Sequence, residues 1–231
     1  MYGTVSRVAV LIAIGTACLQ GLAMGGEARR DVKFTADWKF HKGPAPGAEA
    51  EAYDDSKWAP VRLPHDWAIA GPFDPNGNPE TGKLPWPDEG WYRKRFVLDA
   101  ADSAKQVFFD FDGVMERPVV WINGQKAGSW DYGYCPFRVD ATRFVRFGAE
   151  NVIAVRADTR LLETRWYPGG GMYRAVRMVL CDPVFVGWNG LWVRTTRIEG
   201  STALLTATAT VENRTTGTVG VVVAVEFLDP D

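Results

Sequence analysis

Histidine and cysteine are scarce in this chain, whose 231 residues include two His and three Cys. Zinc sites draw most of their ligands from these two residue types at short spacing, so the sequence excludes a zinc site of that kind. An excess of one charge is also lacking, because 26 basic and 28 acidic residues leave a net charge of −2. A nucleic-acid-binding surface needs concentrated basic residues, and we therefore expect no nucleic acid as partner.

The sequence also lacks long helical patterns. Beyond residue 25, no stretch of ten or more residues shows apolar side chains at helical spacing. The chain has instead 24 Gly, 14 Pro and 13% aromatic residues, including 10 Trp. This composition predicts an all-β protein of short strands joined by many turns.

The first 25 residues have the pattern of a signal peptide. Arg7 is followed by an apolar run over 8–17 and by small residues over 21–25. The apolar run is shorter than the ~20 residues that a membrane span needs. We therefore predict export to the periplasm or the cell exterior, with no membrane contact beyond the signal peptide. A buried N-terminal helix and a lipid anchor at Cys18 are the alternatives.

The other two cysteines, Cys135 and Cys181, both have apolar neighbours in the sequence. Two cysteines do not make a disulfide framework, and apolar surroundings are typical of buried thiols. We predict that both thiols are buried, and the spacing leaves a disulfide between them open.

Residues 27–182 are predicted to form one β-sandwich of the jelly-roll type. Apolar and polar residues alternate over 107–112, which is typical of a strand with one buried face. The dipeptide Asn123-Gly124 lies between apolar runs and predicts a tight hairpin. Further strands are expected over 91–98, 118–122, 151–157 and 171–180.

Residues 184–231 have a different composition, rich in Thr, Val and Ala. We expect strands over 203–212 and 220–227, with a turn at 213–217. The segment is less than half of the ~100 residues that an immunoglobulin-like sandwich needs. It therefore predicts the start of such a sandwich, with the chain ending inside its second domain.

Six motifs in a fixed order resemble the N-terminal sugar-binding domain of family-2 glycoside hydrolases, especially the β-galactosidase branch. The resemblance implies a galactose-binding-like jelly roll, followed by the start of that family's immunoglobulin-like domain. The motifs are LPHDW at 63–67, GWYRK at 90–94, FDGV at 111–114, VWING at 120–124, the segment 128–140, and RWYPGGGMYR at 165–174.

The resemblance also implies what the chain lacks. In that family a C-terminal barrel carries two glutamates that perform a retaining hydrolysis, and no residue here matches either one. We therefore assign no catalytic residue to this chain and expect that barrel as its partner. The implied substrate is a β-galactoside or a related carbohydrate, with glucuronidase and mannosidase specificity left open. A sodium or magnesium ion belongs to the complete enzyme, and we assign no metal or cofactor to this chain.

Two loops supply the candidate substrate-binding residues, because sugars offer apolar faces to aromatic rings and hydroxyl groups to carboxylates. The first loop carries Trp86 and Asp88, and the second carries Asp131 and Tyr132. By resemblance, the first loop reaches the active site at the position of Pro87. The second aligns a sodium- and substrate-binding Asp of some members with Tyr132. Ordinary contact between domains is the alternative for both loops.

Six further motif residues are interpreted as structural. His65 and Asp66 lack a nucleophile, which favours a hydrogen-bonded turn over an acid/base pair. The three glycines over 169–171 predict close approach of another segment, and the flanking arginines are expected to bind carbonyl groups and stack on Trp166 rather than contact sugar. The six residues are His65, Asp66, Trp67, Arg165, Trp166 and Arg174.

A free-standing carbohydrate-binding module without hydrolase activity is the rival interpretation. Its jelly roll would bind sugar without chemistry, whereas the first interpretation makes the chain a wall of an active site. A purely structural adhesive sandwich is a third and weaker possibility, because the motif set is specific.

Overall fold

A computed structural model describes residues 6–9, 27–79, 82–85, 87–161, 166 and 169–227 of the chain. These residues belong to two compact units, one formed by Arg29–Leu180 and one that contains Cys181–Asp231 together with Met1–Ala28. Apart from short 3-10 turns, such as η2 (Ala100–Asp102), the described residues form strands and loops. The prediction of an all-β protein is confirmed. None of the described helical structure is long and apolar enough to cross a membrane.

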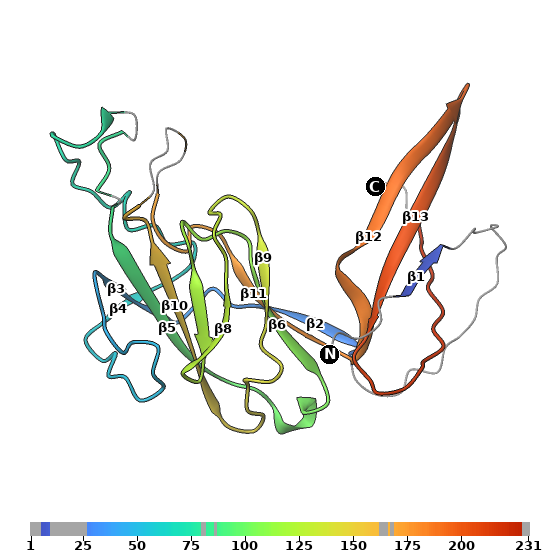
Figure 1. Ribbon diagram of the computed structural model, residues 1–231, viewed down its shortest axis with the longest axis horizontal. Helices are drawn as coiled ribbons and strands as arrows, with labels where there is room; N and C mark the ends of the chain where they lie inside the picture. The colour runs from blue at the N-terminus through green and yellow to red at the C-terminus, as the bar shows by residue number, and fades with distance from the viewer. Residues whose placement is uncertain are drawn as a thin grey trace. The chain divides into compact units, whose positions relative to one another are not determined.

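The unit Arg29–Leu180 is a two-layer sandwich, and Figure 1 shows its two sheets as the two layers. The first sheet has six strands, in the order β4 (Ala59–Val61), β3 (Trp38–Lys42), β5 (Glu89–Val97), β10 (Glu150–Asp158), β7 (Val119–Ile122) and β8 (Gln125–Ser129). The second has four strands, in the order β2 (Arg29–Lys33), β11 (Val176–Cys181), β6 (Gln106–Phe111) and β9 (Phe137–Asp140).

The main core lies between these sheets and consists of the apolar residues that alternate along each strand. On β5, Tyr92 and Phe96 are buried there, as the alternation predicts. On β6, the predicted apolar face is buried as well, and Phe109 packs against Phe34 and Phe96 with ring centroids 5.1 and 5.6 Å apart. Tilted and edge-on ring pairs of this kind stabilise a core beyond their buried area.

A second, smaller core covers the outer face of the six-stranded sheet. The loop of residues 43–58 folds over this face and packs Trp58 and two alanines against Trp91. Arg93 of β5 is fully buried beneath the loop, where its Nε donates to Asp55 Oδ2 at 2.9 Å. Its remaining N–H groups donate to the carbonyl oxygens of residues 48, 50 and 51. Arg93 therefore fastens the loop to the sheet.

The predicted hairpin at Asn123-Gly124 is confirmed. Both residues have positive φ, 49° and 78°, and Ile122 of β7 pairs with Gln125 of β8 across a two-residue turn. Only residues that tolerate this backbone region fit such a turn, which is why the dipeptide identifies it.

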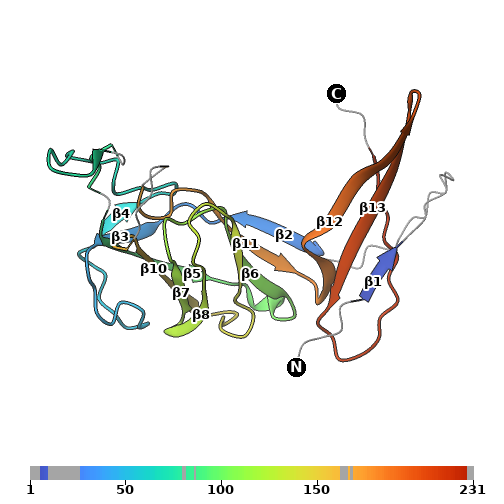
Figure 2. The same ribbon diagram turned by 45° about the horizontal axis from the view of Figure 1, so that its top comes forward.

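The second unit contains a three-stranded sheet with the order β1 (Ser6–Ala9), β13 (Thr202–Asn213) and β12 (Val184–Glu199). Figure 2 shows β12 and β13 as a long hairpin with β1 beside β13. Strand β1 falls within the predicted signal peptide, and residues 1–5 and 10–26 lie outside the described residues. The signal peptide therefore stays a prediction.

Three sequence expectations are wrong. The strand expected over 171–180 begins only at Val176. The strand expected over 220–227 is not formed, and its backbone is irregular. Strand β13 already has β1 on one edge and β12 on the other, so it has no edge left to pair with this segment. Cys135 is exposed rather than buried, because it lies in the loop before β9, whereas Cys181 is buried at the end of β11.

Candidate functional site

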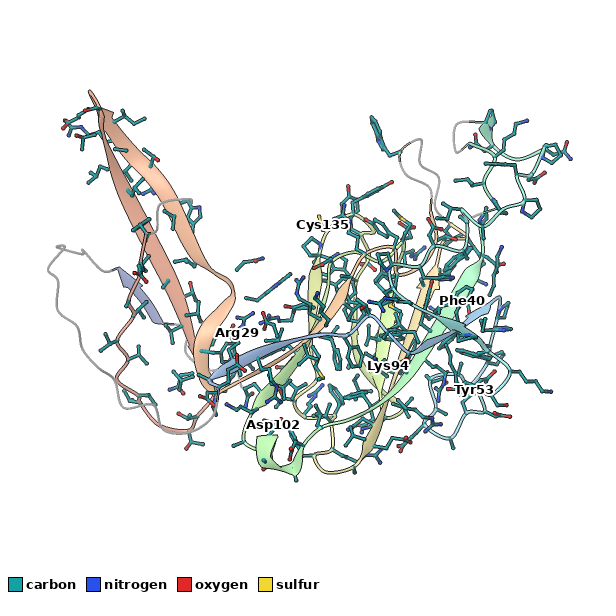
Figure 3. All side chains as sticks on the ribbon, turned by 180° about the vertical axis from the view of Figure 1, so that it is seen from behind. Arg29, Phe40, Tyr53, Lys94, Asp102 and Cys135 are labelled. Carbon is teal, nitrogen blue, oxygen red and sulfur yellow. The ribbon has the colours of Figure 1, made fainter. Side chains whose placement is uncertain are left out.

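Both candidate loops lie at one end of the sandwich, where β5 begins and β6, β8 and β10 end. We call this end the rim and define it by the described residues 65–79, 87–88, 112–118, 130–136, 158–161 and 169–174. Figure 3 places Cys135, and so the loop 130–136, at this end and Asp102 at the opposite end.

The base of the rim is fixed by Trp67. Its backbone N–H donates to the Gly170 carbonyl at 3.0 Å. Its ring lies so close to Gly90 and Gly170 that a Cβ atom added at either glycine would come within 2.2 or 2.3 Å of a ring atom. The close approach predicted for the glycine-rich turn is confirmed at Gly170, because no larger residue leaves room for the ring.

His65 and Asp66 form a hydrogen-bonded turn at the same place. Asp66 Oδ1 accepts from the backbone N–H groups of Ala68 at 2.8 Å and of Gly170 at 3.0 Å. His65 Nδ1 lies 2.8 Å from the Tyr92 hydroxyl, and burial lowers the pKa of His65. These contacts hold the loop bases together, which is a structural role.

Asp88 is held firmly at the start of β5. Its backbone exchanges hydrogen bonds with Thr159, donating to Oγ1 at 3.1 Å and accepting from the N–H at 3.0 Å. Its Oδ1 accepts from the Glu89 N–H at 2.7 Å, and its Oδ2 lies 3.9 Å from Lys42 Nζ. The side chain is 32% exposed, so Asp88 is a positioned carboxylate that solvent reaches. Trp86, its predicted neighbour in the site, lies outside the described residues.

The second loop exposes aromatic rings beside a carboxylate. Asp131 is exposed, and Tyr132 is 56% exposed with its ring edge-on to Tyr134 at 5.4 Å. Trp130 is 42% exposed and stacks on Phe137 at 6.0 Å. Such rings next to a carboxylate can stack on a sugar face and accept hydrogen bonds from its hydroxyl groups.

The loop 130–136 is supported from behind by Tyr173, whose hydroxyl donates to the Gly133 carbonyl at 3.0 Å. Burial raises the pKa of Tyr173, which keeps the hydroxyl protonated and able to donate. The guanidinium of Arg174 lies over the Tyr173 ring, 5.2 Å from its centroid. Trp166 is 74% exposed, and Arg165 lies outside the described residues.

Two short segments connect the candidate loops. A Cβ added at Gly133 would lie 3.3 Å from Glu116 Cβ, so the second loop packs on Glu116. The Glu116 carbonyl accepts from the Asp158 N–H at 2.8 Å, and Asp158 is followed by Thr159, which binds Asp88. The segments that carry Asp88 and Asp131 are therefore linked through these contacts at the same end of the sandwich.

Sequence reasoning missed the charged cluster between these loops. Arg160 Nη2 contacts Asp158 Oδ2 at 2.5 Å and Glu89 Oε2 at 3.0 Å. The hydrogen bond from Arg160 lowers the pKa of Asp158, and the two carboxylates raise that of Arg160. Burial raises the pKa of Glu116 nearby. The polar residues directly after the apolar strand 150–157 were the available sign of this cluster.

Among the residues that the structure describes, no group of three or more His, Cys, Asp or Glu side chains is arranged to hold a metal ion.

Comparison with known proteins identifies the domain. Residues 46–180 match the sugar binding domain of glycosyl hydrolases family 2. The chain is 36% identical over 217 residues to a β-galactosidase of Bacteroides ovatus, which covers 93% of this chain and 25% of that protein. It is 28% identical over 226 residues to a β-glucuronidase of Formosa agariphila, with 88% of this chain and 23% of that protein covered.

The same relationship is seen among solved structures. The crystal structure of a β-glycosidase from Bacteroides vulgatus superposes with a TM-score of 0.76 at 33% identity, covering 81% of this chain and 25% of that one. The chain thus spans about a quarter of the length of these relatives. On this match and on the sandwich described above, the chain belongs to glycoside hydrolase family 2 and contains that family's sugar-binding domain.

Proposed function

We propose that this chain is the sugar-binding part of an exported glycoside hydrolase that cleaves β-galactosides. In this proposal, catalysis resides in a barrel that follows the chain, and the rim walls the substrate site from outside that barrel. The observation that carries the proposal is the rim, where the exposed rings of Trp130 and Tyr132 flank the exposed Asp131 and the solvent-accessible Asp88 lies at the same end of the sandwich.

The charge of the rim favours a galactoside over a glucuronide. A glucuronate carboxylate is repelled by neighbouring carboxylates. The candidate contact residues Asp88 and Asp131 are carboxylates, and Arg160 is paired with Asp158 and Glu89. A neutral galactosyl unit avoids repulsion by Asp88 and Asp131, which supports β-galactosidase rather than β-glucuronidase specificity.

Titration calorimetry of the full chain with galactose and with glucuronic acid tests the proposal. We expect galactose to bind with a dissociation constant around millimolar or weaker, because a partial site buries little ligand surface. Asp131→Asn together with Tyr132→Ala should weaken that binding further, and glucuronic acid should bind more weakly than galactose.

Three results would count against the proposal. Tighter binding of glucuronic acid would support the glucuronidase alternative. Micromolar galactose binding would support a free-standing binding module. If galactose bound equally well to the variant with Asp131→Asn and Tyr132→Ala, these rim residues would not be part of the sugar site.

A further inference from the structure

The chain contains three Asn-Gly dipeptides, at residues 76–77, 123–124 and 189–190. In such a pair the glycine nitrogen can attack Cγ of the asparagine side chain, because glycine has no Cβ to hinder the approach. The N–Cγ bond forms, the Cγ–Nδ2 bond breaks, and ammonia leaves with the proton of the glycine nitrogen. Water then opens the resulting succinimide ring to aspartate or isoaspartate. The three pairs share this chemistry, so their surroundings decide which of them react.

Asn123 is held by four hydrogen bonds to its side-chain amide. Its Oδ1 accepts from the Val152 N–H at 2.8 Å and from Arg146 Nη2 at 3.3 Å. Its Nδ2 donates to the Phe144 carbonyl at 3.0 Å and to Asn151 Oδ1 at 2.8 Å. The amide group must leave these partners before Cγ can turn toward the glycine nitrogen. We therefore expect the fold to protect this pair.

Asn189 has a similar local backbone but a free side chain. Its φ is 52°, against 49° at Asn123, and a glycine follows each of them. Asn189 is exposed, and within the described part of the chain its side chain makes no hydrogen bond or ion pair. Residues 187–190 also lie outside the ladder, because the pairing of β12 with β13 stops at Val186 and resumes at Leu191. Neither a side-chain contact nor ladder pairing thus holds this asparagine.

Asn76 lies on the rim and is exposed as well, and its side chain has no hydrogen bond or ion pair to any described residue. Its backbone belongs to a turn in which the N–H groups of Asn76 and Gly77 donate to Asp74 Oδ1 and to the Asp74 carbonyl, both at 2.9 Å. The bond from Gly77 must open before its nitrogen can attack. An exposed turn opens more readily than the enclosed amide of Asn123, so we expect this pair to react too.

We propose that Asn76 and Asn189 are sites of spontaneous deamidation and that the fold protects Asn123. The proposal concerns modification of the chain itself and does not depend on the proposed function. Each reaction replaces a neutral amide by a carboxylate, so each adds one negative charge. At Asn76 this charge joins the rim, which already carries Asp88 and Asp131. Isoaspartate also routes the main chain through the side chain and lengthens the backbone by a methylene group.

Ageing of the full chain in warm, weakly alkaline buffer tests the proposal. Peptide mapping by mass spectrometry at successive times gives a separate rate of amide loss for each pair. We expect Asn76 and Asn189 to react at least about tenfold faster than Asn123, because opening several hydrogen bonds slows Asn123 by at least that factor. The two sites are judged separately, and the assignment of either site is overturned if it reacts no faster than Asn123.

Unfolding in urea is the control for the role of the fold. The three rates should converge in the unfolded chain, since only the shared dipeptide then remains. If Asn123 stayed slow in urea, its protection would come from neighbouring sequence, and the structural argument would be overturned.

A matched variant with Asn76→Gln and Asn189→Gln identifies the source of the new charge. The longer glutamine side chain must close a larger ring, which forms much more slowly, while polarity and exposure are kept. Ion-exchange chromatography should show acidic forms that accumulate in the unmodified chain and are lost from the variant. Equal accumulation in both chains would place the charge elsewhere and overturn the proposal.

Discussion

At the scale of single residues, the ring of Trp67 makes Gly170 irreplaceable. We predict that Gly170→Ala destabilises the sandwich by about 2 kcal/mol or more, because a Cβ at this position would lie 2.3 Å from the ring and force the core apart. Thermal unfolding should show a melting temperature lower by about 4 °C or more.

Gly217→Ala is the control, because a Cβ at Gly217 would meet no atom within 4 Å. Its melting temperature should stay near that of the unmodified chain. Equal stability of the two variants would mean that Trp67 is not confined as described.

Single residues also show where the sequence was informative. Asn123-Gly124 identified its turn because positive φ at both positions is a local requirement. The burial of Arg93 and the exposure of Cys135 depend on loops that fold over the sheet or project from it, and alternation within a strand carries no information about either. The rim candidates were found because aromatic and acidic residues adjoin in two loops, whereas Arg160 was missed because its partner Glu89 is distant in sequence.

At the scale of elements, the loop of residues 43–58 is fastened by the carboxylate of Asp55. Burial by itself would raise the pKa of Asp55, but hydrogen bonds from Lys39 and Arg93 and their charges outweigh it and hold the pKa below 3.8. Its contribution to stability is therefore complete above about pH 3.8 and is lost as the pH falls through the lowered value.

We predict that Asp55→Asn lowers the free energy of unfolding by about 3 kcal/mol at neutral pH, because it leaves Arg93 buried without its counter-charge. The difference from the unmodified chain should shrink as the pH falls below about 3.8. Urea unfolding at a series of pH values measures both effects.

Asp31→Asn provides the comparison for this series, since Asp31 forms an exposed ion pair with Arg29. Exposed pairs contribute little, so its effect should stay below about 1 kcal/mol at every pH. If the difference in unfolding free energy between Asp55→Asn and the unmodified chain did not change with pH, the stabilising role assigned to the Asp55 carboxylate would be contradicted.

Among the elements, the predicted strands of the sandwich are present, except that the strand expected over 171–180 begins only at Val176, and the strand over 220–227 is not formed. Each of the recovered strands has both a suitable pattern and a neighbour to pair with. The segment 220–227 has the residue pattern of a strand but no neighbouring strand to pair with. Whether a neighbour is available is decided by the rest of the fold rather than by local sequence.

At the scale of the whole molecule, the two units differ in how well their apolar side chains are covered. The sandwich buries its core, whereas Trp188, Leu191 and Trp192 of β12 are 38–56% exposed. We predict that limited proteolysis removes 184–231 and leaves a resistant product that ends near residue 182, because exposed strands are opened easily. Mass spectrometry of the products identifies the cleavage sites.

Deletion of 184–231 gives an independent check. The melting temperature of the sandwich should not fall, and solubility should rise, because fewer apolar side chains are exposed. Aggregation of the shortened chain, or resistance of 184–231 equal to that of the sandwich, would refute this prediction.

Export leads to a separate prediction about the start of the mature chain. Intact mass of the exported protein should place its first residue between about 18 and 27, as expected for cleavage after the small residues over 21–25. Retention of residues 1–17 in the exported protein would rule out this signal.

The Trp67 ring is held between Gly90 and Gly170, so the rim segments attached there can be changed without changing the strands of the sandwich. Residues 68–79 begin directly after Trp67, and the turn 169–171 packs against its ring, so these two rim segments are anchored at one side chain. Segments from other family members could be grafted beyond this anchor, and under the proposed function such a library would change sugar preference while one scaffold is retained.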